Sequence, residues 1–291
     1  MIFLTIFTPT YNRANTIART YESLCKQTCM NFEWLVVDDG STDNTESLVS
    51  EWMKDSIFPI RYIKQSNGGK YRAYNKGLEL AEGEFFFCVD SDDWLPSNSV
   101  ELISQYADIL KQTETLAGLV ALKSYQDANI IGQPYKEPGK HSSLYHLELS
   151  GEGGERSLVF KTSVARLFYF PLETNEHFIT ESVIYDRFEG KYDFIICNDI
   201  LTICEYQENG LSSGNPHSLM LRYPAGYKLY FAQRIDMTPY FLERVTYAIR
   251  YHVFRILYAG PEYNYNGKYR TLVSILSPLG FIAKFYYIRA K

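Results

Sequence analysis

Residues 84–93 read EFFFCVDSDD, so that an apolar run leads directly into three carboxylates. The run from Phe85 to Val89 has no polar interruption, as expected for a central strand covered on both faces of a parallel sheet. Asp90, Asp92 and Asp93 then place three negative charges within four residues at the end of that strand. The segment predicts a buried strand that opens into a polar loop.

Strand and helix patterns alternate on both sides of this segment. We expect strands at residues 2–8, 33–37, 59–64, 84–89, 116–124, 194–197 and 200–205, and helices at residues 14–28, 43–54, 70–81, 96–112 and 180–188. Residues 125–154 are rich in Gly, Pro, His and Ser and predict loops, whereas residues from about 216 onward predict helices. The β-α repetition predicts the α/β class, with a doubly wound, mostly parallel sheet and a C-terminal helical extension.

Polar segments follow four of the expected strands, at residues 9–13, 38–43, 67–72 and 90–93. The carboxyl ends of parallel strands share one edge of a sheet, so these segments should converge on one ligand site. Asp39 offers a carboxylate to a base N–H or a ribose hydroxyl, and Lys70 and Arg72 offer positive charge to a diphosphate. A plainer interpretation is also open, in which Asp43 caps a helix and Asn67-Gly68 is only a turn.

The acidic loop after the central strand predicts a metal site. Three carboxylates this close repel one another, and a divalent cation is the simplest compensation. Mg²⁺ or Mn²⁺ prefers oxygen ligands and is commonly held by one or two carboxylates together with substrate phosphates. The alternative is a solvated acidic turn that caps the next helix, but the position after the central strand favours the metal.

Five motifs in the first 125 residues resemble those of family 2 glycosyltransferases with the GT-A fold. They are Thr8-Pro9-Thr10-Tyr11-Asn12-Arg13, Val36-Val37-Asp38-Asp39-Gly40-Ser41-Thr42-Asp43, Asn67-Gly68-Gly69, Asn75-Lys76-Gly77 and Val89-Asp90-Ser91-Asp92-Asp93. The resemblance implies that Asp90-Ser91-Asp92 is the family's DxD motif, with Asp90 and Asp92 as ligands of Mn²⁺ or Mg²⁺. It also implies a nucleotide-sugar site formed by Pro9, Tyr11, Arg13, Asp38, Asp39, Asn67, Gly68, Lys70, Arg72, Asp90 and Ser91.

The resemblance implies a carboxylate base as well, because these enzymes invert the anomeric centre in one displacement. The family's base often lies in a Glu-Asp pair that opens a helix, and the matching segment here is Phe178-Ile179-Thr180-Glu181-Ser182. Glu181 is the predicted base, with Ser182 standing where the second acid would be. Glu176 and Asp186 are the alternatives, and Glu181 itself has a structural interpretation as a carboxylate favoured by a helix N-terminus. His217, which follows the family-like residues 209–212, is either a metal contact or a residue of a surface loop.

The predicted function is an inverting glycosyltransferase acting in surface polysaccharide or glycan assembly. It would move single sugars from a nucleotide-diphosphate sugar, with UDP-sugars favoured, to a hydroxyl of a sugar or of a lipid-linked glycan; the processive-synthase motif Gln-x-x-Arg-Trp is absent. Two other classes stay open. One is a non-catalytic nucleotide-sugar-binding module, which the missing acid at Ser182 allows. The other is a Mg²⁺-dependent phosphotransferase with Asp38 or Asp90 as nucleophile.

Charge is unevenly distributed along the chain. The 291 residues carry a net charge of −5, which argues against nucleic acid as a partner. Residues 220–291 hold 11 Lys/Arg against 3 Asp/Glu, so the rest of the chain is strongly acidic. We therefore expect a catalytic domain at residues 1–215 and a basic, aromatic helical extension at residues 216–291. Residues 282–291 have the composition of an interfacial helix on anionic lipid, and packing on the catalytic body or in a homodimer is the alternative.

Targeting and redox signals favour the cytoplasm. The five scattered cysteines form no disulfide pattern, and we expect them to be reduced and buried. The N-terminal apolar run lacks a basic region and is cut short by Pro9 and Asn12, so it predicts a strand and not a signal peptide. We expect no apolar run close to the ~20 residues that span a bilayer. The predicted location is the cytoplasm, with contact to the inner membrane surface through the extension.

Overall fold

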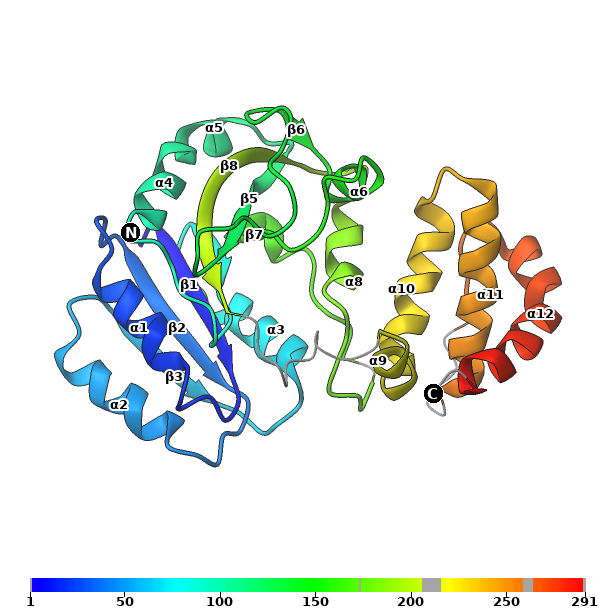
Figure 1. Cartoon of the computed structure of the whole chain (residues 1–291), viewed down its shortest axis with the longest axis horizontal. Coiled ribbons are helices and arrows are strands. Elements are labelled where there is room, and N and C mark those ends of the chain that lie inside the picture. The colour runs from blue at the N-terminus through cyan, green and yellow to red at the C-terminus, as the bar shows by residue number, and fades with distance from the viewer. Residues whose placement is uncertain (1, 173, 206–215, 259–263, 290–291) are drawn as a thin grey trace. The chain divides into compact units, whose positions relative to one another are not determined.

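The structure is a computed structural model that describes residues 2–172, 174–205, 216–258 and 264–289. The chain folds into two compact units, and Figure 1 colours their elements from the N-terminus to the C-terminus. The first unit consists of Met1–Tyr169 and Phe188–Tyr206, and the second of Phe170–Arg187 and Gln207–Lys291. The chain therefore passes between the units three times.

An eight-stranded sheet with the order β3-β2-β1-β4-β7-β5-β8-β6 is the centre of the first unit. Its strands are β1 (Leu4–Thr10), β2 (Phe32–Asp38), β3 (Ile60–Lys64), β4 (Phe85–Cys88), β5 (Leu116–Tyr125), β6 (His141–Ser142), β7 (Ser157–Lys161) and β8 (Asp193–Cys204). The helices around it are α1 (Ile17–Cys25), α2 (Thr45–Asp55), α3 (Lys70–Leu80), α4 (Ser99–Gln105), α5 (Ala107–Gln112), α6 (Leu144–Leu149) and α7 (Thr162–Ala165). Only β6 and β7 pair in antiparallel fashion, so the predicted α/β class with a mostly parallel sheet is confirmed.

Strand β4 lies between β1 and β7 and is covered on both faces, as its sequence predicts. Phe85 and Phe87 join a core that includes residues of α1 and α4. Phe86 packs against Phe7 and against Tyr74 of α3. Successive side chains of a strand alternate between its two faces, so a strand buried on both faces needs an apolar residue at every position.

Several elements differ from the predicted ones. The helix predicted at 96–112 is divided at Tyr106 into α4 and α5. The strands predicted at 194–197 and 200–205 are one strand, β8, because its pairing with β5 continues, with irregular register, across the polar residues Asn198 and Asp199. Residues 125–154 are not only loops, since β6 and α6 lie within them and Ser143 caps α6 by accepting a hydrogen bond from the His146 N–H.

Strand β7 and helix α7 were not predicted. β7 inserts antiparallel between β4 and β5, although it comes after both in the sequence. Gly118 of β5 permits this close pairing, because a Cβ atom there would lie 1.9 Å from the carbonyl oxygen of Val159. Local sequence patterns do not reveal such long-range insertion, since it depends on which strands finally lie side by side.

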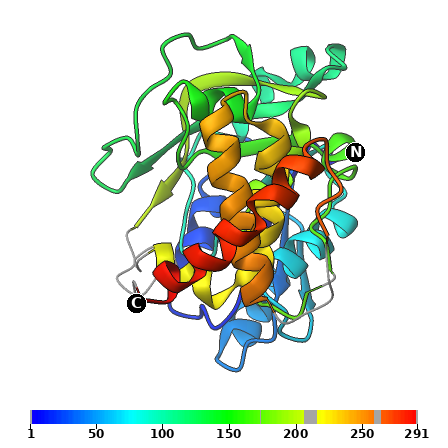
Figure 2. The same ribbon diagram turned by 90° about the vertical axis from the view of Figure 1, so that its right-hand side faces the viewer.

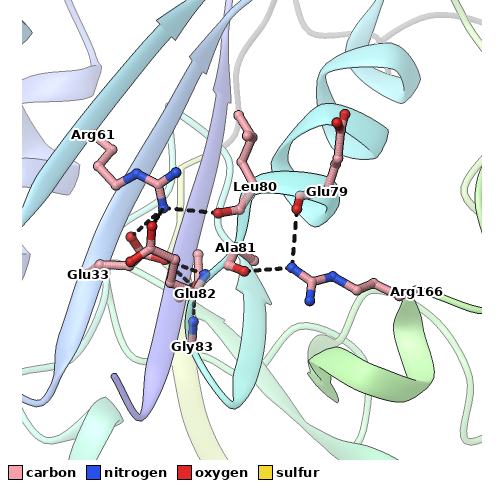
Figure 3. Close-up of polar contacts among 9 residues, drawn as sticks. Glu33, Arg61, Glu79, Leu80, Ala81, Glu82, Gly83 and Arg166 are labelled. Atoms are coloured by element: carbon pink, nitrogen blue, oxygen red, sulfur yellow. Dashed lines mark hydrogen bonds and ion pairs between the residues drawn. The ribbon is translucent and has the colours of Figure 1, made fainter. Parts of the chain in front are cut away.

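A buried polar network closes the edge of the sheet at the amino ends of β1 and β2 (Figure 3). Glu33 is completely buried and accepts hydrogen bonds from Thr5 Oγ1 at 2.6 Å and from the Glu82 N–H at 2.8 Å. Its other oxygen pairs with Arg61 Nη1 at 3.0 Å. Arg61 also donates to the carbonyl of Leu80, so the network secures the end of α3, where carbonyls lack helical partners.

Replacing Glu33 with glutamine is expected to lower the free energy of unfolding by about 1–3 kcal/mol. The glutamine amide keeps the shape of the Glu33 side chain but loses the negative charge that pairs with Arg61. Its NH₂ group would also face a group that donates to Glu33, either the Thr5 hydroxyl or the Arg61 guanidinium. Urea unfolding measures the change. Glu82→Gln is the matched control, because Glu82 also pairs with Arg61 but its side chain is 59% exposed. Equal effects of the two replacements would contradict the assignment.

The second unit is helical in its described residues. Its helices are α8 (Ser182–Tyr185), the short 3₁₀ turn Asp186–Phe188 that leads back to the first unit, α9 (Pro216–Arg222), α10 (Pro224–Met237), α11 (Phe241–Leu257) and α12 (Arg270–Arg289). Apolar and aromatic side chains of α10, α11 and α12 form a core of their own, with Phe231, Ile235, Ala248 and Phe254 at its centre. Figure 2 shows α12 laid across α11. The predicted C-terminal helices are confirmed.

Two further expectations have clear outcomes. All five cysteines are free, and each is buried or half-buried. The expectation of no apolar run close to spanning length is wrong: among the described residues, α12 is one helix of 20 residues that contains an 18-residue stretch with a mean hydropathy of 1.4. Residues 282–288 lie at the end of this long helix and do not form a separate one.

Candidate active site

The predicted polar segments meet at the carboxyl edge of the sheet in the first unit. In the parallel register Thr10 of β1 lies opposite Asp38 of β2, and Asp38 lies opposite Lys64 of β3. β4 runs parallel to β1, so the loop that begins at Asp90 opens at the same edge. Four segments that are distant in sequence therefore surround one region, the arrangement in which α/β proteins bind ligands.

Asp38 is completely buried, and protein groups engage both of its carboxylate oxygens. Oδ1 accepts a hydrogen bond from the Ser41 N–H at 2.6 Å, and Oδ2 accepts one from the hydroxyl of Tyr62. Burial and the adjacent Asp38 carboxylate raise the pKa of Tyr62 far above its ordinary value, so the phenol remains a donor. In this structure Asp38 shapes the turn after β2.

Asp39 holds the glycine-containing loop that follows β3. Its carboxylate accepts hydrogen bonds from Gln65 Nε2 at 2.7 Å and from the N–H groups of Gly68 and Gly69, the latter at 2.7 Å. The side chain of Asn67 donates to the Asp39 carbonyl at 2.9 Å. Asp39 thus joins two of the predicted motifs into one rigid corner.

The end of β1 is tied to the same corner. Asn12 has a positive φ of 52°, its N–H donates to Ser41 Oγ, and its side-chain oxygen accepts from the Thr42 N–H. Asp43 accepts from the Ala14 N–H and from Thr45. Burial raises the pKa of Asp43, but the hydrogen bonds from Thr45 and Ala14 outweigh it and the net pKa is lowered. The predicted helix cap is not formed as such: the N-cap of α2 is Asn44, without a side-chain cap, and Asp43 instead binds the N–H of Thr45, the first residue of the helix, together with the loop at Ala14.

The remaining predicted contact residues line the corner with different exposure. Pro9 and Ser91 are buried, and Tyr11 is 48% exposed at the end of β1. Arg72 of α3 lies against the loop, because a Cβ atom on Gly68 would come within 2.4 Å of its Cδ. Its guanidinium lies 5.2 Å from the ring of Tyr71.

Each carboxylate of the acidic loop is paired with a cation from a different element. Lys70 Nζ at the start of α3 lies 2.7 Å from Asp90 Oδ1. Arg13 Nη2 lies 3.6 Å from Asp92 Oδ2. Lys123 Nζ of β5 lies 3.1 Å from Asp93 Oδ2, with both side chains largely buried. The three negative charges are therefore balanced by three positive charges within the protein.

The pKa values of Asp90 and Asp93 shift in opposite directions, although the neighbouring cations lower both. Burial raises the pKa of Asp90, but Lys70, Lys123 and Arg13 outweigh it and hold the carboxyl below its ordinary pKa. Burial raises the pKa of Asp93 to about 6, and the nearby Asp90 charge adds to the rise. Lys123 keeps its proton, because Asp93 and its neighbours raise its pKa in spite of burial.

Lys123 was not predicted as part of the site. The signal was a single lysine inside the otherwise apolar strand that reads LAGLVALKSY. A charged residue rarely enters a buried strand without a partner, so this lysine pointed to an acid at its level of the sheet. Which acid it meets follows only from the pairing of β5 in the finished sheet.

Asp90 and Asp92 suit a divalent cation in their chemistry. Both are carboxylates of the acidic loop that follows β4, and their side chains are 36% and 22% exposed. Among the described residues, no group of three or more His, Cys, Asp or Glu side chains lies close enough to hold an ion by itself. Phosphate oxygens of a ligand would therefore have to complete the coordination, as is common for Mg²⁺.

Glu181, the predicted base, lies in the second unit at the N-terminus of α8. Its side chain is exposed, and its Oε2 accepts a hydrogen bond from the Tyr185 hydroxyl at 3.4 Å. This position also fits the structural interpretation of a carboxylate at a helix N-terminus.

The two alternative bases have structural partners in the same unit. Glu176 caps α10, because its carboxylate accepts hydrogen bonds from the N–H groups of Ala225 and Gly226. Burial raises the pKa of Glu176, and these N–H groups partly offset the rise. Asp186 is buried in a bidentate ion pair with Arg234, at 2.7 Å and 2.9 Å.

His217 lies on α9 and not in a surface loop. It is half-buried, and its ring centroid lies 5.3 Å from that of Tyr287 on α12. Residues 209–212, the family-like segment before it, lie outside the described residues.

Known proteins are similar to part of this sequence and to this fold. Glycosyltransferase GlyG of Streptococcus pneumoniae serotype 4 is 36% identical over 103 residues, which cover 35% of this chain and 34% of that protein. Putative glycosyltransferase EpsH of Bacillus subtilis is 40% identical over 92 residues, covering 31% and 26%. Hyaluronan synthase of Pasteurella multocida is 35% identical over 99 residues, covering 34% and 10%. The matched region thus spans about a third of the length of the first relative and less of the other two.

Solved structures extend the similarity to nearly the whole chain. S. aureus TarS 1-349 in complex with UDP-GlcNAc has a TM-score of 0.61 at 19% identity, covering 99% of this chain and 88% of that one. Mannosyltransferase PcManGT from Pyrobaculum calidifontis, in complex with GDP-Man and Mn²⁺, has a TM-score of 0.57 at 17% identity, covering 97% and 87%. At these identities the likeness establishes the fold, and the GT-A architecture is confirmed.

The family follows from the sequence match, which contains every predicted motif of the carboxyl edge. Residues 5–148 match the family described as "Glycosyl transferase family 2". Through these residues, the chain belongs to glycosyl transferase family 2.

Proposed function

We propose that this protein is an inverting, metal-dependent glycosyltransferase that moves a single sugar from a nucleotide-diphosphate sugar to a hydroxyl acceptor. The observation that carries the proposal is the carboxyl edge of the sheet, where Asp90 and Asp92 lie beside Lys70 and Arg13. Carboxylates with adjacent cations can hold a metal-bound diphosphate, because the carboxylates bind the metal ion and the cations bind the phosphate oxygens. A UDP-sugar is favoured by the UDP-GlcNAc complex of TarS.

The donor would bind across the corner that Asp39 holds together. Pro9, Tyr11, Arg13 and Asp39 would contact the nucleoside, and Lys70 and Arg72 would offset the charge that develops on the departing diphosphate. Asp90 and Asp92 would hold Mn²⁺ or Mg²⁺, which supplies Lewis-acid stabilisation of the leaving group. The ion pairs of Lys70 and Arg13 would then exchange an aspartate partner for phosphate oxygens.

Glu181 would accept the proton of the attacking hydroxyl. Its exposed carboxylate supports this role, whereas Glu176 caps a helix and Asp186 is fixed in a buried ion pair. Attack from the side opposite the leaving group inverts the anomeric centre in one step, through an oxocarbenium-like state.

The acceptor would be a sugar or a lipid-linked glycan in polysaccharide assembly, by analogy with relatives such as hyaluronan synthase. A lipid-linked acceptor requires contact with a membrane from the cytoplasmic side, and that contact through residues 220–291 belongs to this proposal. The phosphotransferase alternative with Asp38 as nucleophile is disfavoured, because Asp38 is buried with both oxygens engaged.

A nucleotide-sugar binding experiment tests the metal and the donor together. Calorimetry with UDP-GlcNAc and with GDP-mannose, with and without Mn²⁺, is expected to show metal-dependent binding. Asp92→Ala should weaken that binding by about 10- to 100-fold, the equivalent of one charged contact of about 1.5–3 kcal/mol. Asp55→Ala, at the exposed end of α2, is the control and should bind normally. Donor affinity that does not change when Mn²⁺ is removed would reject the metal proposal.

A further inference from the structure

Helix α12 has two apolar sides, of which only one is used inside the protein. Its inner stripe is Val273, Leu276, Gly280, Ala283 and Tyr287, spaced by three or four residues. This stripe faces α11; at Gly280 the fit is so close that a Cβ atom would lie 2.2 Å from Cβ of His252. Such spacing is typical of one helix packed on another.

The outward side is also apolar, which is unusual for a helix that already buries one stripe. Ile275, Ile282 and Tyr286 are 68%, 65% and 72% exposed, and Phe281 and Phe285 are each 54% exposed. Leu279 and Ile288 are 47% and 43% exposed. We call these seven residues the outer face of α12. Large apolar side chains gathered on one exposed surface indicate a binding surface.

The charges on α12 itself have one sign. α12 contains Arg270, Lys284 and Arg289 and no acidic residue. The wider segment of residues 220–291 holds 11 Lys/Arg against 3 Asp/Glu. A partner that covers this face must therefore be apolar where it meets Ile282 and Phe285, and negatively charged around them.

We propose that the outer face of α12 binds the surface of an anionic lipid bilayer, with the helix lying in the plane of the interface. Isoleucine, leucine and phenylalanine side chains would enter the boundary between headgroups and acyl chains, and Lys284 and Arg289 would remain at the level of the anionic headgroups. Each basic residue near such a surface adds attraction. This inference deepens the membrane contact that belongs to the proposed function, but its observations lie in the second unit alone and its test does not require sugar transfer.

The same observations disfavour two other occupants. A second copy of the chain would bring the basic residues of one α12 next to those of the other, with no acid on either helix to compensate. A membrane-spanning α12 would have to carry α11 with it, because the inner stripe is packed there, and α11 contains Glu243, Arg244 and Arg250.

Co-sedimentation of the full chain with vesicles tests the proposal. We expect binding to vesicles of phosphatidylcholine with phosphatidylglycerol, weaker binding to phosphatidylcholine alone, and release by high salt. The double variant Ile282→Asn with Phe285→Asn should bind at least about tenfold more weakly, because it removes two large apolar side chains from the interface. Lys284→Gln with Arg289→Gln should lose most of the preference for the anionic vesicles.

The matched control is Ile57→Asn with Met53→Asn, two exposed apolar residues of the first unit, which should bind like the wild type. All of these positions except half-buried Lys284 are exposed, so thermal unfolding should be nearly unchanged and a failure to fold is readily recognised.

Unchanged vesicle binding in the Ile282/Phe285 variant, or no binding by the wild type, would overturn the proposal. Light scattering that shows a wild-type dimer, converted to a monomer by the same variant, would assign the face to a second copy instead. Binding that resists high salt in the Lys284/Arg289 variant would also overturn it and would indicate insertion across the bilayer.

Discussion

Replacing Glu181 with glutamine is expected to lower turnover by about 10²–10⁴-fold, the usual contribution of a positioned proton acceptor. Glutamine keeps the size of the side chain and can still receive the Tyr185 hydrogen bond, but it cannot take a proton. Donor affinity should stay unchanged, because the proposed donor contacts lie at the carboxyl edge of the sheet. Release of nucleotide from the donor sugar, with water or a glycan as acceptor, measures turnover, and calorimetry measures affinity.

The matched control for this change is Glu176→Gln. Glu176 is a carboxylate of the same unit, but it caps α10, so its replacement should reduce stability and leave the turnover of the folded protein nearly intact. Full activity in the Glu181 variant would refute its role as base. If Glu176→Gln caused the larger loss of turnover, the base would have to be reassigned.

Replacing Asp186 with alanine is expected to lower the free energy of unfolding by about 3–5 kcal/mol. The change leaves the buried guanidinium of Arg234, which is 2% exposed, without its bidentate partner. An unpaired charge in the protein interior lowers the free energy of unfolding far more than an unpaired charge at the surface does. The midpoint of urea unfolding reports the loss.

A double variant separates the cost of an unpaired charge from the value of the pair. Asp186→Leu combined with Arg234→Met removes both charges and should recover most of the lost stability, because apolar replacements of a buried pair are often neutral. The exposed pair of Glu137 and Lys140 serves as the control, and its removal should have no measurable effect. A single Asp186 variant as stable as the wild type would contradict the structural role assigned to this pair.

The sequence was most informative where local pattern and burial agree. The apolar run at residues 84–89 predicted a central strand, and β4 is covered on both faces by Phe85, Phe86 and Phe87. The four polar segments were expected at one edge because parallel strands end together, and Asp39, Gly68 and Asn12 now share one hydrogen-bonded corner. These features follow from periodicity and from the geometry of parallel sheets.

Features that depend on distant partners were not predictable in the same way. The acidic loop was expected to need a cation, but its pairing with Lys70, Arg13 and Lys123 comes from three elements whose neighbours only the folded sheet defines. Glu33 is a similar case, because a single acid in an apolar strand gives no indication of its partner. The interfacial character of residues 282–291 was predicted, but the earlier part of the outer face of α12 was not, because Ser274, Ser277 and Pro278 interrupt its apolar pattern in the sequence, although the helix continues through them.

The three passages of the chain between its units have a practical consequence. Phe170–Arg187 belongs with the C-terminal helices, so no single cut releases one unit intact. Truncation at residue 215 would keep α8, with its buried Val183 and Ile184, but would remove α10, the helix that α8 contacts. Hydrophobic surface that is uncovered in this way promotes aggregation. Trimming would therefore give an insoluble fragment, and any chimera with a relative would have to exchange two separate stretches of sequence together.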